Sequence, residues 1–278
     1  MPDKIVALIG AGGKMGQRII PNLRKFGHKF IGCEKDEEGN AALRKGGVDA
    51  MATEEAVAIA DIVVYAIPDA AIPSLSKKLV PLMKPGSTAI TLDPAAARAG
   101  LLYTREDCTF VVAHPCHPPL FGERETQAEK DDMFGGAAAK QDIVIAFMQG
   151  SEESFAEAET LCRHMFNPVV ECHRITVEQM AILEPAAAEV VCATCAAIMK
   201  EAIDEAIRRG VPEAAARSFL FGHILINLAI TLKSSNPFSD AAMVAIEYGR
   251  RNVFREDWKD VFEPEKIDGA LKEMLRLV

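Results

Sequence analysis

Residues 4–16 read KIVALIGAGGKMG, an apolar run that breaks into glycines and then turns amphipathic. This pattern predicts a buried strand, a tight turn and the start of a helix. Such a turn can hold a phosphate, because bare amides and the positive helix end face the anion and missing side chains let a pyrophosphate approach. Gly10, Gly12 and Gly16 give GxGxxxG, one residue away from the strict dinucleotide spacing GxGxxG. The candidate cofactor-binding residues of this turn are Gly10, Gly12, Gly13, Lys14 and Met15.

The next predicted strand, residues 28–33, is followed directly by an acid. Glu34 falls where a dinucleotide-binding fold places the carboxylate that accepts hydrogen bonds from the adenosine ribose hydroxyls. A carboxylate there repels a 2′-phosphate, and the neighbouring Lys35 is a poor substitute for a dedicated arginine, so the pattern favours NAD over NADP. The structural alternative is an ordinary strand-to-helix turn that carries a surface glutamate.

Strands and helices alternate through the first half of the chain. A short strand is expected near residues 49–51, and apolar runs predict strands at 61–67, 88–92 and 108–113. This order implies a doubly wound parallel sheet of the Rossmann type, in which ligands bind beyond the carboxyl ends of the strands. Four residues end such strands and should meet at one rim. They are His114 and three candidates for cofactor binding, Pro68, Asp69 and Asp93.

Long helical patterns replace the alternation from about residue 174 onward. The prediction is therefore an α/β Rossmann-type domain over residues 1–173, followed by an all-helical domain over residues 174–278 for substrate binding and dimerisation. Residues 219–232 form the most apolar helical run, which is too short to span a bilayer and contains two polar residues. We expect this run to be buried or to lie at the interface of a homodimer.

Charge and cysteine content limit the binding partners and the cellular location that we expect. The 278 residues carry a formal net charge of −9, which argues against nucleic acid or an anionic membrane as a partner. A small acidic substrate stays open, because it needs only local positive charge. Seven cysteines, an odd number without framework spacing, indicate reduced thiols and a cytoplasmic location. The predicted strand so near residue 1 leaves no room for a signal peptide.

A histidine motif follows the strand expected at 108–113. Residues 113–119 read AHPCHPP and place His114 and His117 on a stiff loop at the ligand-binding rim. Imidazole can accept a proton near neutral pH or bind a metal. The alternative is a loop shaped by its prolines, in which either histidine caps a backbone group.

Carboxylates interrupt the apolar start of the helical region. Glu184 lies between Leu183 and Pro185, and Glu189 follows five residues after it. A buried carboxylate needs a metal, a base or a cation as its partner. The alternative is a glutamate near a helix start that faces water, where the helix macrodipole favours it.

The arrangement of a dinucleotide domain before a helical domain resembles the 6-phosphogluconate, β-hydroxyacid and prephenate dehydrogenases. The β-hydroxyacid enzymes carry a catalytic lysine early in the long helix, but residues 177–199 contain no lysine, so that mechanism does not transfer. Across the whole chain, the combination of GAGGKMG, AHPCHPPLF and ILEPAAAE resembles the D-apionate oxidoisomerases. This resemblance implies oxidation of a branched sugar acid with NAD, coupled to a 1,2-shift of its carboxylate-bearing group to give a 3-oxo acid.

Three residues are candidates for the chemistry that this resemblance implies. Oxidation at a hydroxyl carbon needs a base, and His114 is one candidate. The 1,2-shift needs a Lewis acid, and His114 with Glu184 could bind a divalent ion. If His114 is a ligand, Glu189 or a metal-bound hydroxide has to serve as the base. Two rival functions are a simple NAD-dependent hydroxyacid dehydrogenase and a non-catalytic NAD-binding sensor.

Overall fold

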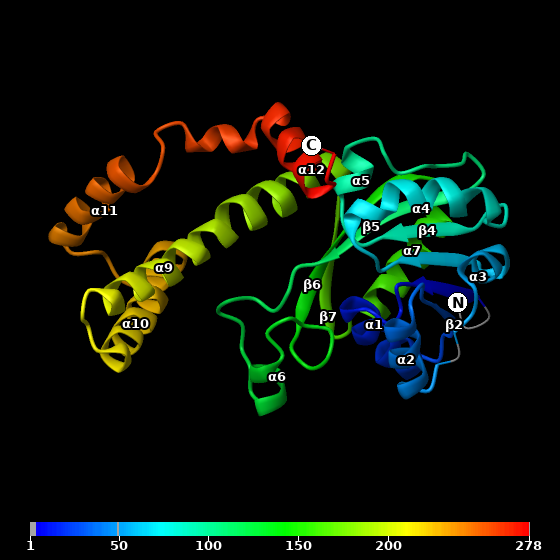
Figure 1. Cartoon of the computed structure of the whole chain (residues 1–278), viewed down its shortest axis with the longest axis horizontal. Coiled ribbons are helices and arrows are strands. Elements are labelled where there is room, and N and C mark those ends of the chain that lie inside the picture. Colours follow the sequence, from blue (N-terminus) through cyan, green and yellow to red (C-terminus); the bar gives the residue numbers. More distant parts are fainter. Residues whose placement is uncertain (1–3, 49, 278) are drawn as a thin grey trace. The chain divides into compact units, whose positions relative to one another are not determined.

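The computed structural model describes residues 4–48 and 50–277 of the chain (Figure 1). It divides into two compact units. The first contains the residues up to Glu184 together with those from Asp268 onward, and the second contains Pro185–Ile267. The short strand expected near residues 49–51 includes Asp49, which lies outside the described residues. Ala50 forms an isolated parallel bridge with Gly32.

The first unit is built on a seven-stranded sheet with the order β2-β1-β3-β4-β5-β6-β7. All neighbouring strands are parallel except β5 and β6, which are antiparallel. The predicted α/β fold of the Rossmann type is therefore confirmed, with one antiparallel pair that the sequence analysis did not anticipate. The strands are β1 (Ile5–Ile9), β2 (Lys29–Cys33), β3 (Ile62–Tyr65), β4 (Thr88–Thr91), β5 (Thr109–Pro115), β6 (Gln141–Gln149) and β7 (Val169–Ile175).

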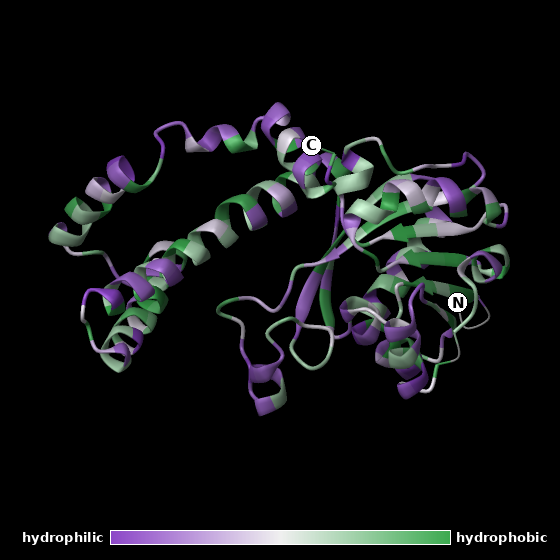
Figure 2. Ribbon diagram, in the orientation of Figure 1, coloured by the Kyte–Doolittle hydropathy of each residue, from purple (hydrophilic) through white to green (hydrophobic). Residues whose placement is uncertain are grey.

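The central strands are mostly apolar because both faces of the sheet are covered, and their few polar residues, such as Thr88 and Thr91 of β4, are buried as well. Alternate residues of each strand enter two separate cores, as Val6 and Leu8 enter one and Ala7 and Ile9 the other. Figure 2 shows these strands largely in the green of hydrophobic residues. Helices α1 (Lys14–Lys25), α2 (Glu37–Lys45) and α7 (Glu152–Met165) supply the first core, and α3 (Thr53–Ile59), α4 (Ile72–Leu79) and α5 (Ala95–Arg98) supply the second.

The strand order fixes where a ligand can bind. From β1 the chain passes to β2 on one side and then crosses to β3 on the other, so the order reverses between β1 and β3. In open α/β sheets the crevice at such a reversal, beyond the carboxyl ends of the strands, is the binding site. The glycine turn directly follows β1, and Pro68–Asp69, Asp93 and His114 belong to the carboxyl ends of β3, β4 and β5.

Helix α8 (Val177–Ala181) belongs to the first unit. Its start is a capping box in which the Thr176 hydroxyl accepts from the Gln179 amide. Its Met180 is fully buried with Val112 of β5 and Ala146 of β6. This packing explains why the unit boundary falls after Glu184, whereas the sequence analysis placed the domain boundary after residue 173. The chain returns to the first unit in α12 (Pro264–Met274), where Asp268 pairs with Arg98 at 3.1 Å.

The second unit is helical, as predicted. It comprises most of a π-helical segment (Ile182–Ala193), α9 (Thr194–Arg208), α10 (Glu213–Lys233), α11 (Asp240–Val253), a short 3₁₀ helix (Trp258–Phe262) and the first turn of α12. Two runs, Val177–Arg208 and Glu213–Lys233, are long and apolar enough by length and composition to cross a membrane. Within these two runs only 11% and 6% of the most apolar windows are buried. The expectation that the run at 219–232 is too short was wrong, because α10 extends it in both directions.

Candidate functional site

The glycine turn after β1 depends on backbone contacts that a side chain would prevent. Gly10 has a φ of +77°, and a Cβ there would lie 2.3 Å from the Ala66 carbonyl oxygen beyond β3. A Cβ on Gly16 would lie 2.5 Å from Cα of Ala11. The amides of Gly10 and Ala11 both donate to the Cys33 carbonyl at the end of β2. The turn is therefore fixed against β2 and β3 at the point where the strand order reverses.

Glu34 lies against this turn, as the sequence predicted. Its Oε2 accepts from the Gly12 amide at 3.1 Å, and its Oε1 accepts from the Lys35 amide at 2.9 Å. The carboxylate is therefore oriented by backbone donors, next to the amides that a dinucleotide phosphate needs. Lys14 begins α1 on the exposed surface, and Met15 packs partly against the first core.

Gly39 is a contact that the sequence analysis missed. A Cβ at Gly39 would lie 2.0 Å from Cγ of Glu34, and a Cβ at Gly12 would lie 2.6 Å from Cα of Gly39. The first turn of α2 thus packs on both Gly12 and Glu34, while Asp36 caps the helix by accepting from the Gly39 amide at 2.9 Å. A glycine is unfavourable inside a helix, so its presence in the first turn of α2 was the one sign in the sequence that this position is constrained.

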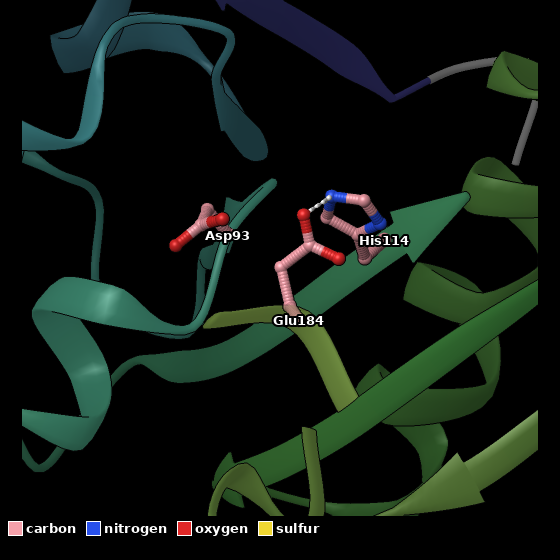
Figure 3. Close-up of side chains that lie close together, drawn as sticks. All are labelled: Asp93, His114 and Glu184. Atoms are coloured by element: carbon pink, nitrogen blue, oxygen red, sulfur yellow. Dashed lines mark ion pairs between the residues drawn. The ribbon is translucent and has the colours of Figure 1, made fainter. Parts of the chain in front are cut away.

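Three acceptor groups converge beyond β4 and β5 (Figure 3). Asp93, His114 and Glu184 each offer one ligand atom, and these atoms lie within 4.8 Å of one another. The register of the sheet explains two of them, because Thr91 pairs with Val112 and each of these residues lies two positions before Asp93 or His114. Side chains two positions apart share a face of the sheet. Glu184 comes from the first turn of the π-helical segment.

The tautomer of His114 follows from its hydrogen bond. Nδ1 lies 2.8 Å from the Pro115 carbonyl oxygen, which can only accept, so Nδ1 carries the proton. Nε2 lies 3.5 Å from Oε1 of Glu184. In the neutral ring these two atoms are both acceptors and repel each other, whereas in the imidazolium Nε2 carries a proton toward the carboxylate. A proton or a cation between the two atoms would relieve the repulsion.

The third acceptor of the cluster, the Asp93 carboxylate, adds to this repulsion. Burial raises the pKa of the Asp93 carboxyl, and the neighbouring Glu184 raises it further, while the Ala95 amide and His114 oppose the shift. The Ala95 amide donates to Oδ1 at 2.7 Å. An ionised carboxylate is costly in this setting, and a bound cation would lower that cost. The sequence analysis grouped Asp93 with the cofactor, but the structure places it with His114 and Glu184.

The π-helical segment carries both predicted glutamates. Pro185 has no amide proton for a helical hydrogen bond, and wider helical turns of this kind often occur at functional sites. Glu184 belongs to the first unit and to the cluster. Glu189 belongs to the second unit and is not one of the cluster's three residues. The structure therefore brings the predicted pair of His114 and Glu184 together and places Asp93 beside them.

His117 and Cys116 extend from the cluster along the loop. The ring of His117 lies 6.0 Å from that of His114, edge to face, and its Nδ1 donates to the Phe134 carbonyl at 2.8 Å. Desolvation and the carboxylates of Asp142 and Glu184 raise the pKa of the Cys116 thiol to about 11. The thiol is therefore protonated near neutral pH and is no nucleophile. All seven cysteines are free, as the sequence analysis expected.

Comparisons with known proteins show the family of this chain. Residues 5–92 match the family described as NADP oxidoreductase, coenzyme F420-dependent, and residues 122–275 match the phosphogluconate dehydrogenase (decarboxylating) C-terminal family. The chain is 42% identical to a D-apionate oxidoisomerase of Pectobacterium atrosepticum over 275 residues, which cover 99% of this chain and 96% of that one. It is also 42% identical to a D-apionate oxidoisomerase of Cupriavidus necator over 276 residues, which cover 99% and 100% of the two chains.

A solved structure extends the likeness to three dimensions. It is a semialdehyde dehydrogenase NAD-binding protein from Cupriavidus necator in complex with calcium and NAD. It shares 42% identity with this chain, with a TM-score of 0.94 and coverage of 98% of this chain and 99% of that one. The glycine turn, the ordered Glu34 and these likenesses together support NAD binding. The chain belongs to the D-apionate oxidoisomerase family and is an enzyme with the fold of the NAD-binding oxidoreductases.

Proposed function

We propose that this enzyme oxidises D-apionate with NAD and rearranges the product to a 3-oxo acid. The observation that carries the proposal is the convergence of Asp93, His114 and Glu184 at the rim of the sheet, the same rim as the glycine turn. Simple hydride transfer needs one base, whereas a skeletal shift also needs an electrophile that holds two neighbouring oxygens. The names of the relatives agree with this reading.

The proposed reaction balances in two stages. In the first, carbon 2 loses its hydrogen as a hydride to the nicotinamide, and its hydroxyl loses a proton, which gives a 2-oxo acid and NADH. In the second, the hydroxyl on carbon 3 loses its proton and becomes a carbonyl while a hydroxymethyl group moves with its bonding electrons from carbon 3 to carbon 2. The carboxylate is bonded to carbon 2, which receives the migrating group, so the group that moves is not the carboxylate-bearing group expected from the sequence. The oxygen on carbon 2 takes up a proton. The carboxylate thus ends on the branched carbon, next to a new 3-oxo group.

The triad fits a divalent cation by its donor chemistry. One imidazole nitrogen and two carboxylates suit a divalent ion such as magnesium, manganese, calcium or zinc. We propose Asp93, Nε2 of His114 and Glu184 as the protein ligands, with the substrate completing the set. The bound ion would polarise the oxygens on carbons 2 and 3 of the substrate. The calcium named in the solved relative supports this proposal.

The protein side chains then have distinct roles. The Pro115 carbonyl holds Nδ1 of His114 protonated, which keeps Nε2 aimed at Glu184. A nitrogen that binds a cation cannot also take the hydroxyl proton, so another group has to be the base. Glu184 has a second oxygen for this purpose, and Glu189 stays the alternative. Glu189→Gln tests this alternative, since it should abolish turnover only if Glu189 is the base.

The proposed cellular setting follows from composition. A net charge of −9 disfavours nucleic acid and anionic membranes as partners, and seven free cysteines suit a reducing cytoplasm. We propose a cytoplasmic enzyme whose partner is a small acidic substrate.

The test of the proposed function combines a cofactor assay with product analysis. The purified enzyme with NAD and D-apionate should generate NADH absorbance, and carbon NMR should show a 3-oxo acid with a rearranged skeleton. A 2-oxo acid that keeps the D-apionate skeleton would indicate the simple dehydrogenase instead. If no substrate-dependent NADH forms, the chain is no D-apionate oxidoisomerase, and the NAD-binding sensor becomes the better interpretation.

We expect the loss of any member of the triad to abolish turnover while NAD binding persists. Asp93→Asn, His114→Ala and Glu184→Ala should each lower kcat by at least about 100-fold, because the cation and the proton path lose a group they need. Steady-state kinetics and NAD titration measure the two effects. Glu171→Ala removes an exposed carboxylate of β7 and is the matched control, which should retain full activity. Equal activity of Asp93→Asn and the unmutated enzyme would remove Asp93 from the site.

We expect Glu34 to set the preference for NAD over NADP. Glu34→Ala should weaken NAD binding by about 1.5–3 kcal/mol, the cost of a charge-assisted hydrogen bond, and should narrow the gap to NADP. Gly39→Ala should have the same effect with Glu34 still present, since the added methyl would overlap Cγ of Glu34. Fluorescence titrations of the unmutated protein and of both variants with NAD and NADP give the six affinities. NADP binding as tight as NAD binding in the unmutated protein would contradict this role of Glu34.

We propose a homodimer in which a second copy covers α10. Phe219 and Leu232 are 63% and 64% exposed, and the most apolar 18-residue window of α10 is 6% buried. A helix this apolar needs a partner, and a soluble enzyme finds it in its own copy. Light scattering at micromolar concentration should give a mass of roughly 60 kDa, twice the 30.1 kDa chain. Phe219→Glu should shift the mass to that of one chain, whereas a monomeric unmutated protein would refute the dimer.

A further inference from the structure

A cavity of about 450 Å³ is lined in part by His117 and is used by none of the roles above. It is large enough for a small organic acid. The loop that follows β5, the first residues of β6 and the start of β7 form its walls. Four charged side chains line it, the cations Arg124 and Lys140 and the carboxylates Glu123 and Asp142.

The cavity begins where the triad ends. The pairing of β5 with β6 continues past Pro115, since the Cys116 amide donates to the Asp142 carbonyl at 2.9 Å. His117 lines the cavity, and its ring centroid lies 6.0 Å from that of His114. The ring of His117 is therefore the contact between the lining of the cavity and the triad.

Two cations on the cavity wall, Arg124 and Lys140, form no ion pair within 4.0 Å among the described residues. Backbone hydrogen bonds lower the pKa of the Glu129 carboxyl, and the nearby Lys140 lowers it further. The guanidinium of Arg124 is half-buried and is held by Sδ of Met133 at 2.8 Å and more loosely by the Pro118 carbonyl at 3.5 Å. A thioether is a weak acceptor, so most N–H donors of the Arg124 guanidinium stay available for a ligand. Lys140 adds a second positive charge. A planar guanidinium with free donors is suited to bind a carboxylate through two parallel hydrogen bonds.

Other groups of the cavity accept hydrogen bonds. Nδ1 of His117 donates to Phe134, which leaves its Nε2 as an acceptor. The Asp142 carboxylate accepts a hydrogen bond from the Glu171 amide at 3.0 Å and lies 3.2 Å from Nε2 of His173. Its remaining lone pairs can accept hydrogen bonds from a ligand. Donors for a carboxylate thus lie beside acceptors for hydroxyl groups. This combination matches one class of ligand, a carboxylate that carries several hydroxyls.

We propose that this cavity is the subsite for the carboxylate of the substrate, with Arg124 as its anchor. The inference rests on the proposed function, because it takes a polyhydroxylated acid as the substrate. Anchoring the carboxylate beside His117 holds the hydroxyl-bearing carbons toward His114, where oxidation and migration occur. Arg124 is then a specificity residue that selects acids over neutral sugars and alcohols.

The test uses the shape-matched variant Arg124→Met. The KM for D-apionate should rise about 10- to 100-fold, which corresponds to the loss of a charge-assisted pair, while kcat changes less. Arg124→Lys should recover part of this loss, because the charge returns without the fork. The amide of D-apionate is the neutral probe: the unmutated enzyme should discriminate strongly against it, and Arg124→Met should not. Lys130→Met, an exposed lysine of α6 (Gln127–Asp131) that does not line the cavity, is the control and should change nothing.

Several results would overturn the subsite. An unchanged KM in Arg124→Met, with an unchanged melting temperature and NAD affinity, contradicts the anchor even if D-apionate is the substrate. If Arg124→Met does not fold, Lys140→Met on the same cavity wall has to raise the KM. If the unmutated enzyme does not oxidise D-apionate, the proposed function fails, and calorimetry with D-gluconate still tests the subsite. Weaker D-gluconate binding in Arg124→Met supports it, whereas equal binding, or none to the unmutated protein, refutes it.

Discussion

The central interaction of the site is the mutual repulsion of three acceptors, Asp93, Nε2 of His114 and Glu184. Two carboxylates and an imidazole nitrogen within 4.8 Å of one another disfavour their fully deprotonated state. The fold fixes each of them, by strand register, by the Pro115 carbonyl and by the first turn of a π-helical segment. The cation that we propose at this point would relieve the repulsion and would be the centre of the proposed chemistry.

The same sheet places the glycine turn and the triad at one edge. The reversal of strand order between β1 and β3 places the glycine turn and the ends of β3, β4 and β5 on one edge. Close backbone contacts replace side chains where the turn meets its neighbours, at Gly10 against Ala66 and at Gly12 against Gly39. The proposed sites for NAD, for a cation and for the substrate carboxylate thus lie along one edge of the sheet. Each of them is formed by the ends of different strands.

The features predicted from sequence were those encoded by local pattern. The glycine turn, Glu34 and the strand ends at Asp93 and His114 could be located because the ends of parallel strands meet at one edge. Glu184 could be located because an acid in an apolar run needs a partner. The partnership of Asp93 with His114 could not, since it depends on the register of β4 against β5. Gly39, the packing of α8 on the sheet and the cavity lined in part by His117 likewise arise from contacts between distant segments.

The most direct test of the cation site is anomalous scattering from crystals grown with manganese, NAD and D-apionate. The account predicts one strong metal peak within about 2.0–2.6 Å of an oxygen of Asp93, of Nε2 of His114 and of an oxygen of Glu184. It also predicts that substrate oxygens complete the coordination of that metal. The absence of a peak at this position with both ligands bound would contradict the central claim, and Nε2 of His114 would then act as a plain proton acceptor.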